Sequence, residues 1–183
     1  MQFQRIFVAL DESQLCQWVF DRAVDIAPSN SASLLLFHCL APENIGQSIG
    51  PMSAELGLYP DMVERTYEAQ SQYLEQHQNQ IRQTLQHYCE IATAKGFACE
   101  FDYHIGDPGS SICETAQAWN ADLILVGRRG RSGLTEALLG SVSNYVVHHA
   151  HCAVLVIQGT ADISSNSTPS PKSGDRLSNS FDQ

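Results

Sequence analysis

The chain has 183 residues, with 20 acidic and 10 basic side chains, and therefore a formal net charge of −10 at pH 7. Nucleic acids and anionic membranes both attract basic surface, so this balance argues against a general binder of nucleic acid or of membranes. Apolar residues make up 43% of the chain, which is typical of a globular domain, and no apolar run approaches the roughly 20 residues of a membrane span.

Along the chain, short apolar runs alternate with segments of helical periodicity. Runs at 3–10, 33–40 and 122–127 predict buried strands of the kind found in parallel sheets. The weakly alternating segment 97–104 and the run at 152–157 predict two further strands. Four helices are expected between them, from Ser13 to Pro28, from Asp61 to Gly96, from Asp107 to Trp119, and over 141–150. The first three begin at residues that commonly cap helices, Ser13, Asp61 and Asp107.

Apolar spacing also predicts which side each helix buries. The expected inward residues are Leu15, Val19, Ala23 and Ile26 on the first helix, Tyr67, Leu74, Ile81, Leu85, Tyr88 and Ala92 on the second, and Ile112, Ala116 and Trp119 on the third. The stripe on the long second helix could also indicate a coiled coil. It is too short and too punctuated for one, so core packing is the favoured interpretation.

The order β-α-β-α-β-α-β-α-β predicts an α/β fold, an open five-stranded parallel sheet with helices on both faces and right-handed crossovers. This domain is expected to span residues 1–158. The segment 41–60 contains six glycines and prolines and is expected to be a long loop. The serine-rich tail at 159–183 carries too little apolar surface to fold and is expected to be disordered.

Candidate binding residues follow the first and fourth strands. Ligands of open α/β sheets sit beyond the carboxyl ends of the strands, where the strand order reverses. Asp11 follows the first strand, and glycines at 127, 130, 133 and 140 follow the fourth, where they would let backbone N–H groups approach an anion. Gly140 and Ser141 precede a helix, whose N-terminus offers unpaired N–H donors. These features favour a phosphate site.

The distribution of positive charge supports an anion site. Two of the ten cationic residues lie in the tail, and three of the other eight, Arg128, Arg129 and Arg131, lie on the glycine loop. A solvated loop, in which the arginines serve only solubility, is the alternative. The loop lacks the Gly-Lys-Ser/Thr ending of a Walker A motif. The first strand-to-helix turn contains no glycine, unlike the GxGxxG dinucleotide fingerprint.

Three separated segments form a recognisable set. They are the opening strand at 6–13, the loop pattern Gly127-x2-Gly130-x9-Gly140-Ser141, and the closing segment 148–157. This set resembles the universal stress protein family, in its ATP-binding branch, over about residues 3–158. The resemblance implies a Rossmann-like sheet in the strand order 3-2-1-4-5.

The resemblance also implies a role for each matching residue. Asp11 would contact the adenine or the ribose, the backbone near Cys39 would contact the adenine, and Val126 and Gly127 would line the ribose. The phosphates would be held by Gly130, Arg131, Gly140, Ser141 and Val142, with a further contact from Ser143. ATP or another adenine nucleotide is the implied ligand, and Mg²⁺ could bind through its phosphates near Asp11.

A homodimer is implied as well, through the fifth strand at 153–157, because an apolar edge would otherwise be exposed. Three positions depart from the family's pattern. Arg128 replaces a small residue and could add phosphate affinity or crowd the site. Glu12 also replaces a small residue and would repel a phosphate if it turned inward. Ala153 replaces a frequent proline, with little expected consequence.

Other chemistry is weakly indicated. The histidines at 148, 149 and 151 lack well-spaced further ligands, so no metal site is expected. His38 and His104 lie near strand ends, where either could approach a nucleotide, but a hydrogen-bonded structural role is favoured. No spacing indicates a nucleophile set, and no strand-end Asp is placed to hold a catalytic metal, so no catalytic residue is assigned.

The leading hypothesis is a cytoplasmic homodimer that binds ATP, ADP or AMP and acts as a stress-response regulator or sensor. The cytoplasm is expected because the first residues lack an export-signal pattern and the six cysteines include no Cys-x-x-Cys pair. The nucleotide would order the loop at 128–140, and an unidentified protein partner would read that state. The alternatives are a slow ATPase or phosphotransferase, and a structural dimer without nucleotide.

Overall fold

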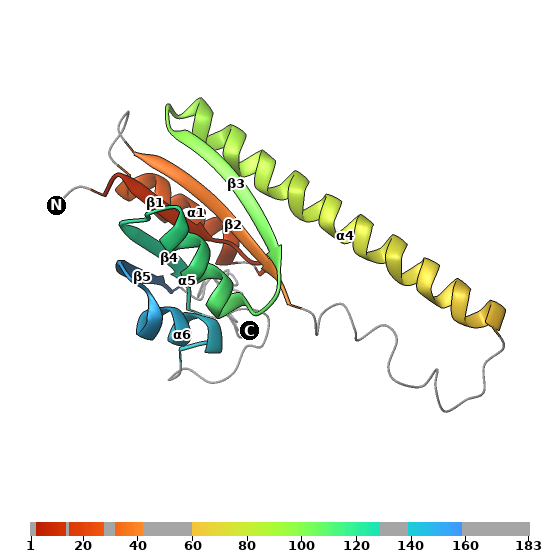
Figure 1. Ribbon diagram of the computed structural model, residues 1–183. Coiled ribbons are helices and arrows are strands. Elements are labelled where there is room, and N and C mark those ends of the chain that lie inside the picture. Colours follow the sequence, from red (N-terminus) through yellow and green to blue (C-terminus); the bar gives the residue numbers. More distant parts are fainter. Residues whose placement is uncertain (1–2, 14, 28–31, 42–59, 129–138, 159–183) are drawn as a thin grey trace, which may run out of the picture.

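A computed structural model of the chain describes residues 3–13, 15–27, 32–41, 60–128 and 139–158, with only the backbone described at 60–67. Most of the predicted long loop, the middle of the glycine loop at 129–138 and the serine-rich tail lie outside these residues. The described residues form a sheet with helices on both of its faces (Figure 1).

Five strands form one parallel sheet in the order β3-β2-β1-β4-β5. They are β1 (Arg5–Ala9), β2 (Ser33–Leu40), β3 (Ala98–Ile105), β4 (Leu123–Gly127) and β5 (Ala153–Ile157). The α/β fold and the expected strand order are confirmed. The strand order reverses at β1, which lies between β2 and β4, and a ligand site is therefore expected at its carboxyl end.

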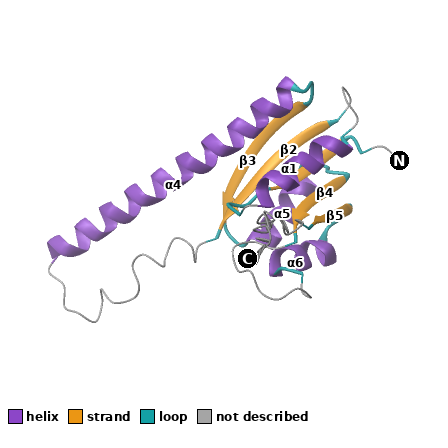
Figure 2. Cartoon of the chain, turned by 180° about the vertical axis from the view of Figure 1, so that it is seen from behind, coloured by secondary structure: helices purple, strands orange, loops and turns teal. Residues whose placement is uncertain are grey.

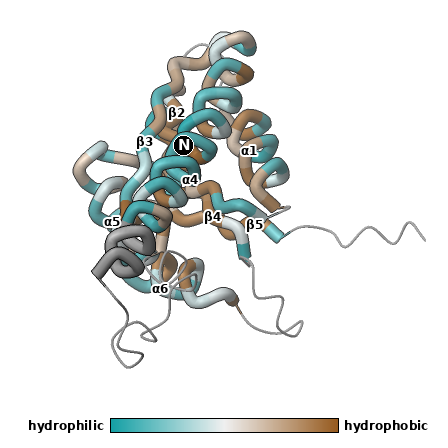
Figure 3. Tube along the Cα trace, turned by 90° about the vertical axis from the view of Figure 1, so that its right-hand side faces the viewer, coloured by the Kyte–Doolittle hydropathy of each residue, from teal (hydrophilic) through white to brown (hydrophobic). Residues whose placement is uncertain are grey.

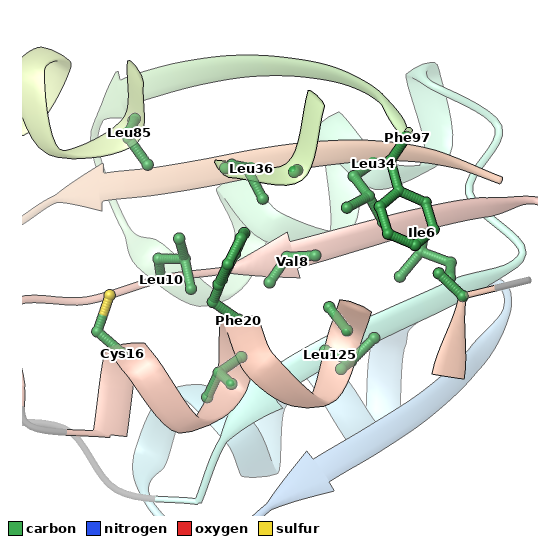
Figure 4. Close-up of a cluster of buried hydrophobic side chains, with 14 of the residues drawn as sticks. Ile6, Val8, Leu10, Cys16, Phe20, Leu34, Leu36, Leu85, Phe97 and Leu125 are labelled. Carbon is green, nitrogen blue, oxygen red and sulfur yellow. The ribbon is translucent and has the colours of Figure 1, made fainter. Parts of the chain in front are cut away.

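The described helices form one layer on each face of the sheet (Figures 1 and 2). They are α1 (Leu15–Ile26), α4 (Pro60–Ala94), α5 (Pro108–Ala118) and α6 (Ser141–His149). Successive side chains of β1 point to opposite faces of the sheet, so the core has two parts. Ile6 and Val8 pack with α1 and α4 (Figure 4), whereas Phe7 and Ala9 pack with α5 and α6. Within the described residues, no helix is long and apolar enough to cross a membrane.

Helix α1 buries Val19 and Ala23 as expected, but its buried face is rotated from the predicted one. Its buried residues are Cys16, Val19, Phe20 and Ala23. The prediction of Leu15 and Ile26 as inward residues is wrong, since Leu15 is only partly buried and Ile26 is 37% exposed. Phe20 is fully buried and packs on Tyr88 of α4, with ring centroids 4.7 Å apart. Burial of this large ring sets the rotation of the helix, and spacing alone does not reveal which apolar residue dominates.

Helix α4 has 35 residues and is therefore about 52 Å long. It begins at Pro60, one residue before the predicted cap Asp61. Ile81 and Leu85 are buried as expected, and hydrophobic positions recur between hydrophilic ones along the helix (Figure 3). Its N-terminal part extends beyond the sheet (Figures 1 and 2). Gly96 follows its end with φ 92°, a conformation that glycine adopts readily, and confirms the predicted stop.

Candidate functional site

A cavity of about 520 Å³ opens at the carboxyl ends of β1, β2 and β4. The first residues of α5 and α6 complete its wall. Eight of the ten predicted site residues line it: Asp11, Cys39, Val126, Gly127, Gly140, Ser141, Val142 and Ser143. The other two, Gly130 and Arg131, lie outside the described residues. Segments that are far apart in the sequence therefore meet where the strand order reverses.

The N-terminus of α6 is open on the cavity side. Gly140 is its N-cap, with φ −60° and ψ 155°, and no side chain among the described residues caps the helix. The first helical hydrogen bond runs from Asn144 N to Gly140 O, at 2.9 Å. The backbone N–H groups of Ser141, Val142 and Ser143 therefore have no carbonyl acceptor within the helix. They lie at the positive end of the helix dipole. This geometry suits an anion.

The N-terminus of α5 lines the same cavity but is already capped. The Asp107 side chain accepts a hydrogen bond from Ser110 N at 2.9 Å, which confirms the predicted cap. This hydrogen bond, together with one from the Ser110 hydroxyl, lowers the pKa of Asp107. A carboxylate thus occupies the anion position at α5. Of the two helix starts in the wall, α6 is the one that can receive a phosphate.

The two described ends of the glycine loop are joined by hydrogen bonds. Gly140 N donates to Arg128 O at 2.8 Å, and Arg128 N donates to Ile157 O of β5 at 2.7 Å. Ser143 is 1% exposed, and its hydroxyl lies 3.1 Å from Arg128 O and 3.0 Å from Gly140 O, either of which can accept its proton. These bonds hold Gly140 against the end of β4.

Asp11 is held by a local turn at the end of β1. Its Oδ1 accepts from Ser13 N at 3.0 Å and from the Ser13 hydroxyl. The Ser13 oxygen in turn accepts from Leu15 N at 3.2 Å, which confirms Ser13 as a cap of α1. The carboxylate is thereby oriented at the cavity wall between the ends of β2 and β4.

The end of β2 contributes two residues with shifted pKa values. Burial raises the pKa of the Cys39 thiol, whose sulfur lies 3.5 Å from Gly106 O. Burial lowers the pKa of His38, whose Nδ1 lies 2.9 Å from Leu10 O. The hydrogen-bonded structural role predicted for His38 is confirmed. His38 also lines the cavity, in keeping with the alternative that it approaches a ligand, whereas His104 does not line it.

A smaller cavity of about 280 Å³ adjoins the first one and shares Leu10, Asp11, Glu12 and His38 with it. Ser13 and residues of α1 and α4 form the rest of its lining. Glu12 Oε1 pairs with His77 Nε2 of α4. Glu12, whose inward turn was expected to repel a phosphate, is thus engaged by a residue that lies 65 positions away in the sequence.

Among the described residues, no three or more histidine, cysteine or acidic side chains are grouped as a metal site. Two of the C-terminal histidines contact backbone carbonyls instead. His149 Nδ1 lies 2.8 Å from Tyr145 O, and His151 Nε2 lies 3.1 Å from Ala121 O. On β3, His104 lies beside Asp102, with 3.3 Å between Nε2 and Oδ2.

Comparison with known proteins identifies relatives along almost the whole described chain. The model of the universal stress protein family matches residues 2–158. Universal stress protein Sll1388 of Synechocystis is 37% identical over 162 residues, which cover 86% of this chain and 99% of the relative.

Solved structures share the fold. A universal stress protein in complex with cAMP aligns with a TM-score of 0.57 and 24% identity, over 86% of this chain and 98% of that one. A universal stress protein family protein of Arabidopsis thaliana, with AMP bound, aligns with a TM-score of 0.54 and 20% identity. The alignment covers 90% of this chain and 97% of that one. At these identities the likeness shows the fold alone.

Proposed function

The chain belongs to the universal stress protein family, and from that premise we propose that it binds an adenine nucleotide (ATP, ADP or AMP) and acts as a regulator or sensor. The observation that carries the proposal is the uncapped N-terminus of α6 in the wall of the 520 Å³ cavity, beside Asp11 and Gly127. The relatives solved with cAMP and with AMP support the choice of an adenine nucleotide.

The proposed ligand lies along the carboxyl edge of the sheet. Its phosphates meet the N–H groups of Ser141 and Val142 beyond β4, its ribose lies by Asp11 at β1, and its base lies at the end of β2. Neighbouring strands are about 4.8 Å apart, so this layout covers about 10 Å from β4 to β2. Gly130 and Arg131 are proposed to complete the phosphate site, and Mg²⁺ to bind through the phosphates.

A regulatory role follows from the hydrogen bonds at the ends of the glycine loop. A phosphate at α6 would lie beside Gly140, which is bonded directly to Arg128 at the other end of the loop. The nucleotide can thereby bias the conformation of the loop, and a protein partner can read that conformation. Slow ATP hydrolysis is the competing proposal, and phosphate release above that of a Gly130 variant would favour it.

We further propose that two copies pair through β5. This strand lies at one edge of the sheet and contains only apolar residues, of which Leu155 is 37% exposed. The β3 edge carries Glu100 and Asp102, and charged residues on an edge strand discourage pairing. A cytoplasmic location remains part of the proposal.

The proposed site is tested by the variant Gly140→Val. The backbone of Gly140 is extended, a conformation that valine accepts, so the variant should fold. Its branched side chain would occupy space beside the first N–H groups of α6. Isothermal titration calorimetry with ATP and AMP should show at least about a tenfold loss of affinity, which corresponds to about 1.4 kcal/mol. An unchanged affinity in a folded variant would place the nucleotide elsewhere.

A further inference from the structure

His38 has a ring nitrogen that the fold does not use. The side chain is only 8% exposed, and Ser143 is the other buried polar residue in the described part of the chain. The Ser143 hydroxyl is engaged at the loop ends, and His38 Nδ1 is engaged with Leu10 O at 2.9 Å. Within the described residues, His38 Nε2 has no hydrogen-bond partner.

The bond to Leu10 fixes the chemical character of the second nitrogen. A carbonyl oxygen can only accept, so Nδ1 carries the proton. Burial lowers the pKa of His38, which keeps the ring neutral at neutral pH. In the neutral ring, Nε2 is then a hydrogen-bond acceptor. A molecule that meets it must present an N–H or O–H group.

The ring lies on the side of the sheet that holds the smaller cavity. Leu34, Leu36 and Leu40 pack with α1 and α4, and His38 shares their side of β2 by strand alternation. The smaller cavity is lined by Cys16 of α1 and by Ile81 and Leu85 of α4, as well as by His38. Figure 4 shows Leu10, Cys16 and Leu85 near the arrowhead ends of β1 and β2.

The two cavities adjoin at the ends of β1 and β2, where both are lined by Leu10, Asp11, Glu12 and His38. Phosphates at α6 and ribose at β1 direct the base toward β2, and therefore toward His38. The other ionisable residues shared by both cavities, Asp11 and Glu12, are carboxylates and also accept hydrogen bonds. This end of the site thus favours a nucleobase whose edge donates hydrogen bonds.

We propose that the smaller cavity receives the edge of the nucleobase, and that His38 Nε2 accepts a hydrogen bond from the exocyclic amino group of adenine. His38 is then a specificity-determining residue. It selects a 6-amino purine over a 6-oxo purine, whose oxygen would face an acceptor with no proton between them. The inference rests on the proposed nucleotide binding and names the group that recognises the base.

The test compares AMP with IMP, which differ at that position in carrying an amino or an oxo group. Calorimetry on nucleotide-free wild-type protein should give at least about tenfold tighter binding of AMP, because an unsatisfied buried acceptor costs about 1–3 kcal/mol. In His38→Asn, the amide nitrogen can still donate to Leu10 O, but no atom remains at the Nε2 position. The ratio of the two affinities should fall to about one, mainly through weaker AMP binding.

His104→Asn is the matched control, because His104 lines neither of the two cavities. It should keep the wild-type ratio. AMP binding with no preference over IMP, or a full preference in folded His38→Asn, would overturn the role of His38 and leave the proposed function standing. A wild type that binds none of ATP, ADP and AMP would overturn both. If the variant does not fold, a wild type that binds AMP and IMP equally well still overturns the role of His38.

Discussion

At Ser143, one buried hydroxyl lies within hydrogen-bonding distance of two carbonyl oxygens at the ends of the glycine loop. Both carbonyls have other partners, since Arg128 O accepts from Gly140 N and Gly140 O accepts from Asn144 N. Loss of the hydroxyl therefore removes a bond without leaving a buried carbonyl unpaired. Its contribution is to fix the position of Gly140 beside the first N–H groups of α6.

We expect Ser143→Ala to lower the free energy of unfolding by about 1 kcal/mol, the usual net value of one internal hydrogen bond. Nucleotide affinity should fall modestly as well, because Gly140 is less well held. Urea unfolding and calorimetry measure the two effects. Ser110→Ala, at the start of α5, is the control for affinity. A Ser143→Ala protein that matches the wild type in both measurements would show that Ser143 does not position Gly140.

Glu12 shows what a sequence cannot reveal at the scale of a single residue. It stands where the family often has a small residue, and its charge was expected to be unfavourable to a phosphate if the side chain turned inward. Its partner His77 lies 65 positions away on α4, and only packing of that helix brings the two together. Asp107 is the opposite case, because a cap acts on residues next to it in the sequence and was predicted correctly.

At the scale of elements, the two helix starts in the cavity wall differ in one respect. Asp107 supplies α5 with a carboxylate cap, whereas Gly140 leaves α6 without a side-chain cap. A helix start without a cap is less stable than it could be. The sequence thus forgoes stability at the point where the proposed phosphate binds.

The variant Gly140→Asp should separate stability from binding. Aspartate at this N-cap should stabilise α6 by a few tenths of a kcal/mol, since it can accept from the first-turn N–H groups. The same carboxylate should weaken nucleotide binding at least about tenfold, because it occupies the anion position and repels a phosphate. Thermal unfolding and calorimetry provide the two readouts.

Gly140→Asn is the matched comparison. It caps the helix without a charge and should weaken binding less than Gly140→Asp does. If Gly140→Asp bound ATP as tightly as the wild type, the N-terminus of α6 would not be the phosphate site.

The elements themselves were largely predictable. Buried parallel strands are nearly continuous apolar runs, and the bounds of β2 match the prediction, 33–40. The glycine spacing and the strand-end Asp11 also located most of the cavity wall. The rotation of α1 was not predictable, because Leu15 and Phe20 are both apolar and only contact with Tyr88 favours Phe20. The place of His38 in the cavity wall was not predictable either, because it also depends on tertiary packing.

At the scale of the whole molecule, the two edges of the sheet are unequal. The β3 edge carries acidic residues, and Asp102 Oδ1 accepts a hydrogen bond from Tyr103 N at 2.8 Å, which occupies that backbone donor. The β5 edge has no charged residue. Pairing between copies should therefore involve β5.

We expect Leu155→Glu to convert a dimer to a monomer, because each copy would bring a carboxylate to an apolar contact. Sedimentation velocity measures the change. Ile105→Glu, on the exposed end of β3 at the opposite edge, should leave the dimer intact. A wild type that sediments as a monomer, or a dimer unaffected by Leu155→Glu, would contradict pairing through this strand.

The central claim is that the cavity beside α6 holds an adenine nucleotide. The most direct measurement is to purify the protein without added nucleotide, denature it and identify the released molecules by chromatography and mass spectrometry. Any emptied protein is then titrated with ATP, ADP and AMP in a calorimeter. The account predicts about one adenine nucleotide per chain, released or bound. A protein that releases none and binds none of the three would contradict it.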